Sequence, residues 1–462
     1  MAKPILIIQM QRMGDLILSF PLMLWLERTF PGHPIWVMAE PRFAAPLVRI
    51  SPNVRYVGFD RHDLVTREKF ALVVNLSHRP ESLTLAGQLE TEALIGGYVR
   101  NGIHRIAGTW QEYRTSLTHN NRHNCFHWAD LNALDVIPLA TMAATRWPAP
   151  RTMASSGRKV GLFLGASDPG KRPGVAFWAG LVGELERRKW VPILLGGPAE
   201  KALGREVRSA AGHGVANACG TLGLDQFAVL GQSLAAMITP DTGPMHLAAW
   251  SGLRVLNLSM GPVHAWETGP YQPGHVVLRS ARDCVGCWQC RFETPRCHES
   301  FAPTRVVRVL EAMAHGQGLA RLKPPGLEIL ATGRDALGLY DLAHLWSRPC
   351  AGQAVSAYWR AFWAHAFGLA GDEKCRRAAG ELWSNHERLA RGMARAGLEF
   401  VREVSSSMSD PGRFVGHWTA SAPMLRPLTG YAAIHLANHD GASASVRQVL
   451  DLGELHLSLL SR

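Results

Sequence analysis

The stretch Met237–His246 constrains the fold of this chain more than any other, because it predicts a buried strand that turns sharply into a helix. The apolar run ends at Ile238, and the polar turn 241–243 follows. Pro244 suits the first turn of a helix, where its missing N–H leaves no hydrogen bond unmade. Such a helix directs free N–H groups and its positive dipole end toward the carboxyl edge of the sheet. Open α/β sheets bind phosphorylated ligands at that edge, so the stretch predicts a nucleotide or sugar-phosphate site.

Strand-like and helix-like segments alternate over most of the chain, which predicts an α/β fold with parallel sheets covered on both faces. The predicted strands are 4–10, 35–38, 54–59, 71–76, 160–164, 192–195, 235–239 and 255–259. The predicted helices are 15–30, 42–50, 80–92, 122–136, 175–188, 199–211, 224–231, 245–251 and 304–315. Prolines and serines across 138–158 mark a linker, so two successive α/β domains are expected.

The pattern changes after the second series, because residues 320–462 show almost no strand signal. Helical spacing predicts helices at 336–347, 354–369, 373–397 and 443–460. Several tryptophans of this region are predicted to be exposed: Trp346, Trp359, Trp363 and Trp383. We therefore expect three parts, namely an α/β domain at 1–150, a second at 151–318 and an appended helical region at 319–462.

Composition narrows the class of protein. Of 462 residues, 47% are hydrophobic and 19% charged, as in soluble globular proteins. No apolar run reaches the roughly 20 residues of a membrane span, and the start resembles a strand rather than a signal peptide, so a cytoplasmic protein is expected. The net charge of +12 fits a nucleic acid, an anionic membrane face, a phosphorylated substrate or only a solvated basic surface. No nucleic-acid motif is visible.

Three further strand ends carry residues suited to a phosphate or sugar site. Gly14 and Asp15 follow the first strand, where Asp15 is either an N-cap or a general base that the helix dipole keeps ionised. Ser167 and Lys171 lie in a small-residue loop that could hold a pyrophosphate, although the spacing is not that of a P-loop. Glu200 follows Gly196-Gly-Pro and could accept ribose hydroxyls, or simply stabilise a helix start.

The turn after the strand 235–239 contributes four more candidates. Asp241 could accept hydrogen bonds from sugar hydroxyls, while Thr242 and Gly243 could donate to phosphate. His246 falls in the first helical turn, where a structural histidine is the alternative to a ligand contact.

These segments occur in a fixed order, and together the chain resembles glycosyltransferase family 9, the heptosyltransferases of lipopolysaccharide core assembly. The resemblance covers roughly residues 3–315. It rests on Arg12-Met-Gly-Asp15, Gly165-Ala-Ser with Lys171, Leu194-Leu-Gly-Gly-Pro-Ala-Glu200, Asn217-Ala-Cys-Gly-Thr, Asp241-Thr-Gly-Pro-Met-His246 and Gly261-Pro with Thr268-Gly-Pro-Tyr271.

The resemblance implies a GT-B architecture, in which two Rossmann-like domains face a cleft. The first domain would bind the acceptor and the second an ADP-heptose-like donor, by an inverting reaction without a metal. Asp15 matches the family's general base. Donor positions are matched by Ser167, Lys171, Glu200, Asp241, Thr242 and Gly243. The acceptor would be an anionic lipid-linked glycan, which would hold the protein near the inner face of the inner membrane.

Two features lie outside these motifs. Arg12 could bind an acceptor phosphate, although a surface arginine is the alternative. The cluster Cys284, Cys287, Cys290 and Cys297 has spacing compatible with structural zinc or an iron–sulfur centre, and a metal-free reduced loop is the alternative.

Two other functional classes compete with the transferase. One is a non-catalytic nucleotide-sugar-binding or scaffold protein that uses the helical region as its interaction surface. The other is a metal-dependent nucleic-acid binder built on the cysteines and the positive charge. The four strand-end segments favour the transferase over both, so nucleic acid is not an expected partner.

Overall fold

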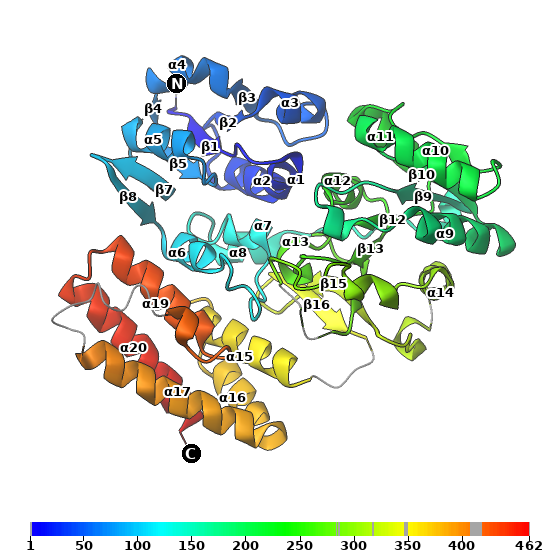
Figure 1. Cartoon of the computed structure of the whole chain (residues 1–462). Coiled ribbons are helices and arrows are strands. Elements are labelled where there is room, and N and C mark those ends of the chain that lie inside the picture. The colour runs from blue at the N-terminus through cyan, green and yellow to red at the C-terminus, as the bar shows by residue number, and fades with distance from the viewer. Residues whose placement is uncertain are drawn as a thin grey trace.

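The computed structural model describes residues 2–282, 284, 287–316, 318–345, 350–406 and 418–461. Two α/β halves and a group of long helices make up this part of the chain (Figure 1). The first half runs from the N-terminus into the connecting segment before residue 159, and the helices lie beneath it in the view of Figure 1.

The first half is built on a six-stranded sheet in the order β3-β2-β1-β5-β7-β8. The strands are β1 (Ile5–Ile8), β2 (Ile35–Ala39), β3 (Arg55–Gly58), β5 (Leu72–Asn75), β7 (Leu94–Arg100) and β8 (Ile103–Ala107). All neighbours are parallel except β7 and β8. The four strands predicted in this half match β1, β2, β3 and β5, because buried parallel strands are continuous apolar runs. A short pair, β4 (Lys69–Phe70) and β6 (Glu90–Thr91), lies outside this sheet.

The helices of the first half are shorter than predicted. They are α1 (Met13–Leu18), α2 (Phe20–Thr29), α3 (Pro41–Ala44), α4 (His62–Thr66), α5 (Pro80–Gln88), α6 (Thr109–Ser116), α7 (Trp128–Leu131) and α8 (Leu139–Ala144). The predicted helix 15–30 is divided at Ser19. The Ser19 hydroxyl donates to the Asp15 carbonyl, and Pro21, two residues further on, has no N–H to continue the helical hydrogen bonds. The helix predicted at 122–136 is too long, because only α7 is helical there.

The second half contains an eight-stranded sheet in the order β11-β10-β9-β12-β13-β14-β15-β16. The strands are β9 (Lys159–Phe163), β10 (Val191–Leu195), β11 (Ala216–Asn217), β12 (Ala236–Pro240), β13 (Val255–Ser259), β14 (Val276–Ser280), β15 (Leu327–Arg334) and β16 (Tyr340–His344). The helices are α9 (Val175–Arg187), α10 (Lys201–Ala210), α11 (Leu224–Gly231), α12 (Gly243–Trp250), α13 (Ala265–Thr268) and α14 (Pro303–Ala314). Every strand and helix predicted between 160 and 315 has a counterpart here.

Strands β15 and β16 correct the prediction that residues after 320 are almost wholly helical. They form an antiparallel hairpin on the edge of β14, with Val276 opposite Ala331. The helix predicted at 336–347 is wrong, because Tyr340 starts β16 and is fully buried. The second sheet therefore continues past residue 319.

The C-terminal helices are α15 (Ala351–Ala366), α16 (Glu373–Asn385), α17 (Glu387–Ser406), α19 (Arg426–Asn438) and α20 (Ser443–Leu460). They confirm the helical segments predicted at 354–369, 373–397 and 443–460, except that the middle one is divided at His386. The expectation of exposed tryptophans was wrong for Trp359 and Trp363, which are fully buried, and Trp383 is half-buried. Trp346 lies outside the described residues.

These helices share a hydrophobic core with the first half. The ring centroids of Trp110 and Phe367 lie 5.0 Å apart, and those of Tyr113 and Trp363 lie 5.3 Å apart. Helix α19 packs on α6, which brings the chain's C-terminal region against the first sheet's edge (Figure 1). Among the described residues, no helix has the length and hydropathy of a membrane span.

Candidate active site

The two halves meet where α1 and α12 begin. A Cβ on Gly14 would lie 3.5 Å from the Gly243 Cα and from the His246 Cδ2, so the helix starts are in close contact. A Cβ on Gly243 would in turn lie 2.8 Å from the Met13 methyl group and 3.4 Å from the Gly14 nitrogen. The predicted first turn and the predicted 241–246 turn are therefore side by side, although they are far apart in the sequence.

Asp15 lies in the first turn of α1 and is half-buried. Its Oδ2 accepts a hydrogen bond of 3.1 Å from the backbone N–H of Arg12, which is the N-cap residue, so Asp15 stabilises the helix start from the third helical position and is not itself the N-cap. Burial raises the pKa of the Asp15 carboxyl, while the Arg12 N–H and the nearby charge of Arg114 act in the opposite direction. Desolvation has the largest effect on this pKa. A carboxylate with a raised pKa is a stronger base.

Asp241 is held from two sides at the end of β12. Its Oδ2 accepts hydrogen bonds from Lys171 Nζ at 3.2 Å and from Thr268 Oγ1 at 2.9 Å. Asp241 is only 6% exposed and Lys171 20% exposed, so the pair is shielded from water. The ammonium group thus lies at the start of α12, where the free N–H groups of the helix end also lie.

His246 is buried beside this pair. Its Nε2 lies 3.8 Å from Asp241 Oδ1, and its Nδ1 has no hydrogen-bond partner among the described atoms. Burial and, to a smaller extent, the charge of Lys171 lower the pKa of His246 to about 4 against the opposing charge of Asp241, so the ring is neutral at physiological pH. A neutral ring with a free nitrogen can accept from or donate to a ligand, depending on its tautomer.

Arg12 links the two halves. Its Nη1 donates to the Ser167 hydroxyl over 2.8 Å, and both side chains are exposed. Ser167 starts the loop that ends at Lys171, and the Asp168 side chain fixes that loop by accepting from the Gly170 N–H at 2.7 Å. Arg12, predicted for the acceptor, is therefore next to a residue predicted for the donor.

Glu200 is packed against the two glycine-containing strand ends of β9 and β10. A Cβ on Gly165 would lie 2.5 Å from the Glu200 carboxyl carbon, so only glycine permits this approach. Glu200 Oε2 accepts from the Gly197 N–H at 2.8 Å. One carboxylate oxygen of Glu200 therefore stabilises the N-terminus of the helical segment that begins at Pro198.

The segment that carries Cys297 and His298 supports the loop 167–171. His298 Nε2 donates to the Gly170 carbonyl over 2.7 Å, and the Gly261 N–H contacts Cys297 Sγ at 3.3 Å. Gly261 has a φ of +74°, and a Cβ there would lie 2.1 Å from the Gly170 carbonyl oxygen. Sequence reasoning missed this support, because neither Cys297 nor His298 belongs to a strand-end motif.

The four clustered cysteines are all free thiols. Burial and the neighbouring sulfurs raise the pKa of Cys287 and of Cys297. Within the described ranges, no three of their sulfurs lie within 4.8 Å of one another, the spacing that identifies a candidate ion site elsewhere in the chain.

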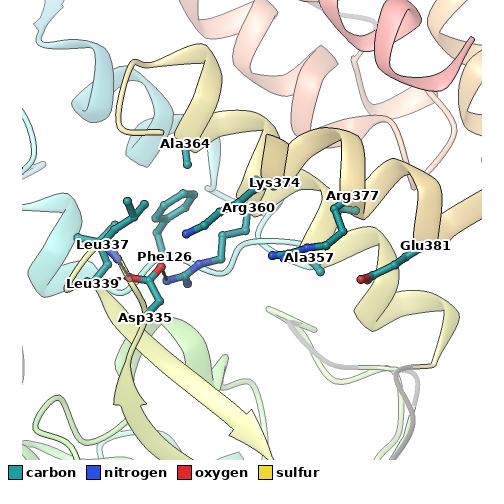
Figure 2. A pocket seen from close by; sticks show the side chains of 12 residues that line it. Phe126, Asp335, Leu337, Leu339, Ala357, Arg360, Ala364, Lys374, Arg377 and Glu381 are labelled. Atoms are coloured by element: carbon teal, nitrogen blue, oxygen red, sulfur yellow. Dashed lines mark hydrogen bonds and ion pairs between the residues drawn. The ribbon is translucent and has the colours of Figure 1, made fainter. Parts of the chain in front are cut away.

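Two cavities of several hundred Å³ lie outside this group of side chains. One of about 710 Å³ lies between the halves and is lined by Arg49 and Ile50 on one side and by α11 on the other. The second, of about 370 Å³, lies between the β15–β16 hairpin and helices α15 and α16, away from Asp15 (Figure 2). Figure 2 shows the side chains of Arg360, Lys374 and Arg377 along the second cavity. Arg360 pairs with Asp335 at 2.9 Å there, so the positive charge of the cavity lining is partly neutralised.

Comparison with known proteins agrees with this geometry. Residues 111–294 match glycosyltransferase family 9 (heptosyltransferase). The resemblance seen in the motifs and the enzyme class, a glycosyltransferase, are thereby confirmed. The matched segment contains the loops of Lys171, Glu200 and Asp241 and begins after Asp15.

Two solved structures have the same fold. The glycosyltransferase family 9 structure from Veillonella parvula is 17% identical, with a TM-score of 0.54 over 68% of this chain and 98% of that one. E. coli ADP-heptose lps heptosyltransferase II is 20% identical, with a TM-score of 0.51 over 68% of this chain and 99% of that one. These likenesses confirm the expected GT-B architecture. A search of curated proteins finds no match.

Sequence reasoning named most of the side chains brought together here, since Asp15, Lys171, Asp241, Gly243 and His246 converge. It did not find Thr268 as a partner of Asp241, nor Arg114 as a charge near Asp15. Thr268 belongs to the motif Thr268-Gly-Pro-Tyr271 quoted above, so its hydroxyl group could have been recognised from the sequence as a candidate site group. Arg114 lies on α6, a helix that the sequence pattern did not predict.

Proposed function

We propose that this protein is an inverting, metal-independent glycosyltransferase that moves a sugar, heptose from ADP-heptose, to a lipopolysaccharide-core or related glycan acceptor. One observation carries the proposal: the carboxylate of Asp15 lies at the same junction as the Lys171–Asp241 pair and the start of α12. The family description and the name of the E. coli structure support the choice of heptose and ADP.

The chemistry follows from this juxtaposition. Breaking the bond between the anomeric carbon and the diphosphate builds negative charge on the leaving phosphate. Lys171 and the free N–H groups at the start of α12 would stabilise that charge. Asp15 would take the proton from the acceptor hydroxyl as it attacks from the opposite face, which inverts the configuration. No protein nucleophile and no catalytic cofactor are assigned to this step.

The remaining donor contacts are assigned by position. Ser167, Thr242 and Gly243 would bind the diphosphate, Glu200 the ribose, and Asp241 with His246 the sugar. Glu200 retains one carboxylate oxygen outside its bond to Gly197, which would serve a ribose hydroxyl.

The acceptor assignment depends on Arg12 and on the net charge of the whole chain. The Arg12 guanidinium is exposed beside Ser167 and would bind a phosphate of an anionic lipid-linked acceptor. The net charge of +12 would favour peripheral contact with the anionic inner face of the inner membrane, in the cytoplasm. We assign the acceptor to 1–150, the donor to 151–318 and a supporting role to 319–462. The cysteine cluster receives a structural role through the Cys297–Gly261 contact, with or without zinc or an iron–sulfur centre.

The experiment is a transfer assay with ADP-heptose and a deacylated lipopolysaccharide-core acceptor. We expect ADP release with formation of a glycoside of inverted configuration, read by NMR of the anomeric proton, at a rate that a chelator leaves unchanged. Binding of ADP-heptose without any transfer or hydrolysis would instead favour a non-catalytic nucleotide-sugar-binding protein. A preference for UDP or GDP over ADP in a thermal-shift screen would contradict the donor assignment.

A further inference from the structure

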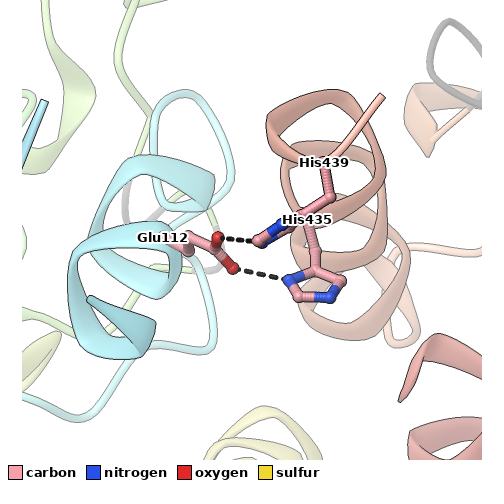
Figure 3. Close-up of side chains that lie close together, drawn as sticks. All are labelled: Glu112, His435 and His439. Carbon is pink, nitrogen blue, oxygen red and sulfur yellow. Dashed lines mark hydrogen bonds and ion pairs between the residues drawn. The ribbon is translucent and has the colours of Figure 1, made fainter. Parts of the chain in front are cut away.

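A second cluster of ligand-type side chains lies away from the donor loops, where α6 meets α19. Glu112 of α6 faces His435 of α19 and His439, the C-cap residue of that helix (Figure 3). His435 Nδ1 lies 2.6 Å from Glu112 Oε2, and His439 Nε2 lies 3.0 Å from Glu112 Oε1. One nitrogen or oxygen atom from each residue lies within 4.8 Å of the others, the only such group of His, Cys, Asp or Glu among the described residues.

The spacing of the two histidines explains why they converge. The His439 N–H donates to the His435 carbonyl over 3.2 Å, so the last helical turn extends to His439. Residues four apart on a helix share a face, so both imidazoles project toward the same point. Their ring centroids lie 4.6 Å apart. A carboxylate from a different helix faces both rings, so the three ligand-type atoms surround one position (Figure 3).

Other side chains orient these groups as outer partners orient metal ligands. His435 Nε2 lies 2.8 Å from Gln448 Oε1, which leaves Nδ1 directed at the cluster. Asn438 donates to Glu112 Oε1, and the Tyr431 hydroxyl donates to Oε2 over 3.4 Å. Glu112 and His435 are buried, so their directions are fixed by packing as well.

The cluster is also open to solvent on one side. The His439 side chain is 46% exposed. A hollow of about 300 Å³ borders it, lined by Tyr98, Arg105, Ile106, Asn438, His439 and Asp440. An ion could enter there, and water could complete its coordination.

We propose that Glu112, His435 and His439 bind a divalent transition-metal ion, for which Zn²⁺ fits best, and that the ion ties α19 to α6. Two imidazole nitrogens and one carboxylate oxygen are ligands that zinc accepts, with water in the fourth position. The proposed role is structural, at the junction of the helical region and the first half, and does not depend on sugar transfer.

The test is the metal content of the full chain, purified after incubation with Zn²⁺ and desalting, in the wild type, His439→Ala, His435→Gln and the control His386→Ala. His386 lies at the break between α16 and α17 and does not belong to the cluster. We expect the His439 and His435 variants to lose one equivalent of zinc that the wild type and the control retain. Because His439 is half-exposed, its variant should fold, which circular dichroism checks.

X-ray absorption at the zinc edge separates this site from the cysteines. Nitrogen and oxygen ligands give distances of about 2.0–2.2 Å, whereas thiolate sulfur gives about 2.3 Å. We expect the zinc lost in His439→Ala to be the nitrogen- and oxygen-ligated fraction, and a chelator to lower the Tm of the wild type but not of that variant. Equal zinc content in all four proteins, or zinc with sulfur ligands only, would overturn the proposal and leave a metal-free hydrogen-bonded contact.

Discussion

Asp15, which we assign as the general base, also lowers the stability of the folded chain when its carboxylate is ionised. Because burial raises its pKa above the ordinary value of 3.8, the folded chain binds a proton there more tightly than the unfolded chain does. The ionised carboxylate therefore lowers the free energy of unfolding above the folded-state pKa, and this penalty disappears below the unfolded-state pKa.

We therefore predict that Asp15→Asn raises the Tm at neutral pH, and that the difference from wild type shrinks as the pH falls toward about 4. The asparagine oxygen can still accept from the Arg12 N–H, so this hydrogen bond at the helix start is kept. Thermal unfolding followed by circular dichroism over this pH range checks it. A variant less stable than wild type at neutral pH would contradict the desolvation argument.

Lys171 provides a second residue-scale prediction. Lys171→Met keeps the length of the side chain and removes its charge, so ADP should lose one charge-assisted contact. Such a contact is worth about 1.5–3 kcal/mol, which raises the Kd for ADP roughly 10- to 100-fold. Isothermal titration calorimetry measures this, with Lys159→Met at the opposite end of β9 as the matched control. Equal affinities in the two variants would remove Lys171 from the donor site.

At the scale of elements, the loop 167–171 depends on its contact with Gly261. Gly261→Ala adds a Cβ that would meet the Gly170 carbonyl at 2.1 Å, in addition to left-handed strain of about 1–2 kcal/mol. Gly212 also has a positive φ but nothing within 4 Å of its Cβ position, so Gly212→Ala isolates the strain. We predict that Gly261→Ala lowers both the Tm and ADP affinity, whereas Gly212→Ala lowers only the Tm. Unchanged ADP affinity in Gly261→Ala would show that this contact does not shape the donor loop.

The sequence predicted elements where one local signal dominates. Buried parallel strands such as β1 and β12 are apolar runs that end in glycine-containing turns, so their positions and their site residues were recognisable. The β15–β16 hairpin was missed because its strands are an edge addition to β14, which is a tertiary pairing without a long apolar run. The contact of Gly14 with Gly243 and the Thr268–Asp241 bond likewise depend on how distant segments pack.

At the scale of the whole molecule, the C-terminal helices are part of the first half's packing rather than a separate attachment. The buried Trp363 lies against Tyr113, and Trp110 lies against Phe367. Helix α6 thus contacts these helices on one side, while its Arg114 influences Asp15. Periodicity predicted helices here but could not predict which surface would cover their tryptophans.

We predict that a chain truncated after residue 350 loses stability and aggregates, because Tyr113 and Trp110 lose their aromatic partners. Burying one large aromatic side chain contributes roughly 1.5–3 kcal/mol, and several are exposed at once. Size-exclusion chromatography and thermal unfolding of 1–350 against the full chain check this. A soluble monomeric fragment with the wild-type Tm would contradict a shared core.

The most direct test of the account measures turnover and donor binding together in Asp15→Asn, with Glu27→Gln on the exposed face of α2 as the control. We expect kcat for transfer to fall about 10²- to 10⁴-fold, as loss of a general base requires, while the Kd for ADP stays within about threefold of wild type. Turnover equal to that of the wild type and of Glu27→Gln would contradict the assignment of Asp15 as the base and, with it, the transferase site built around the α1–α12 junction.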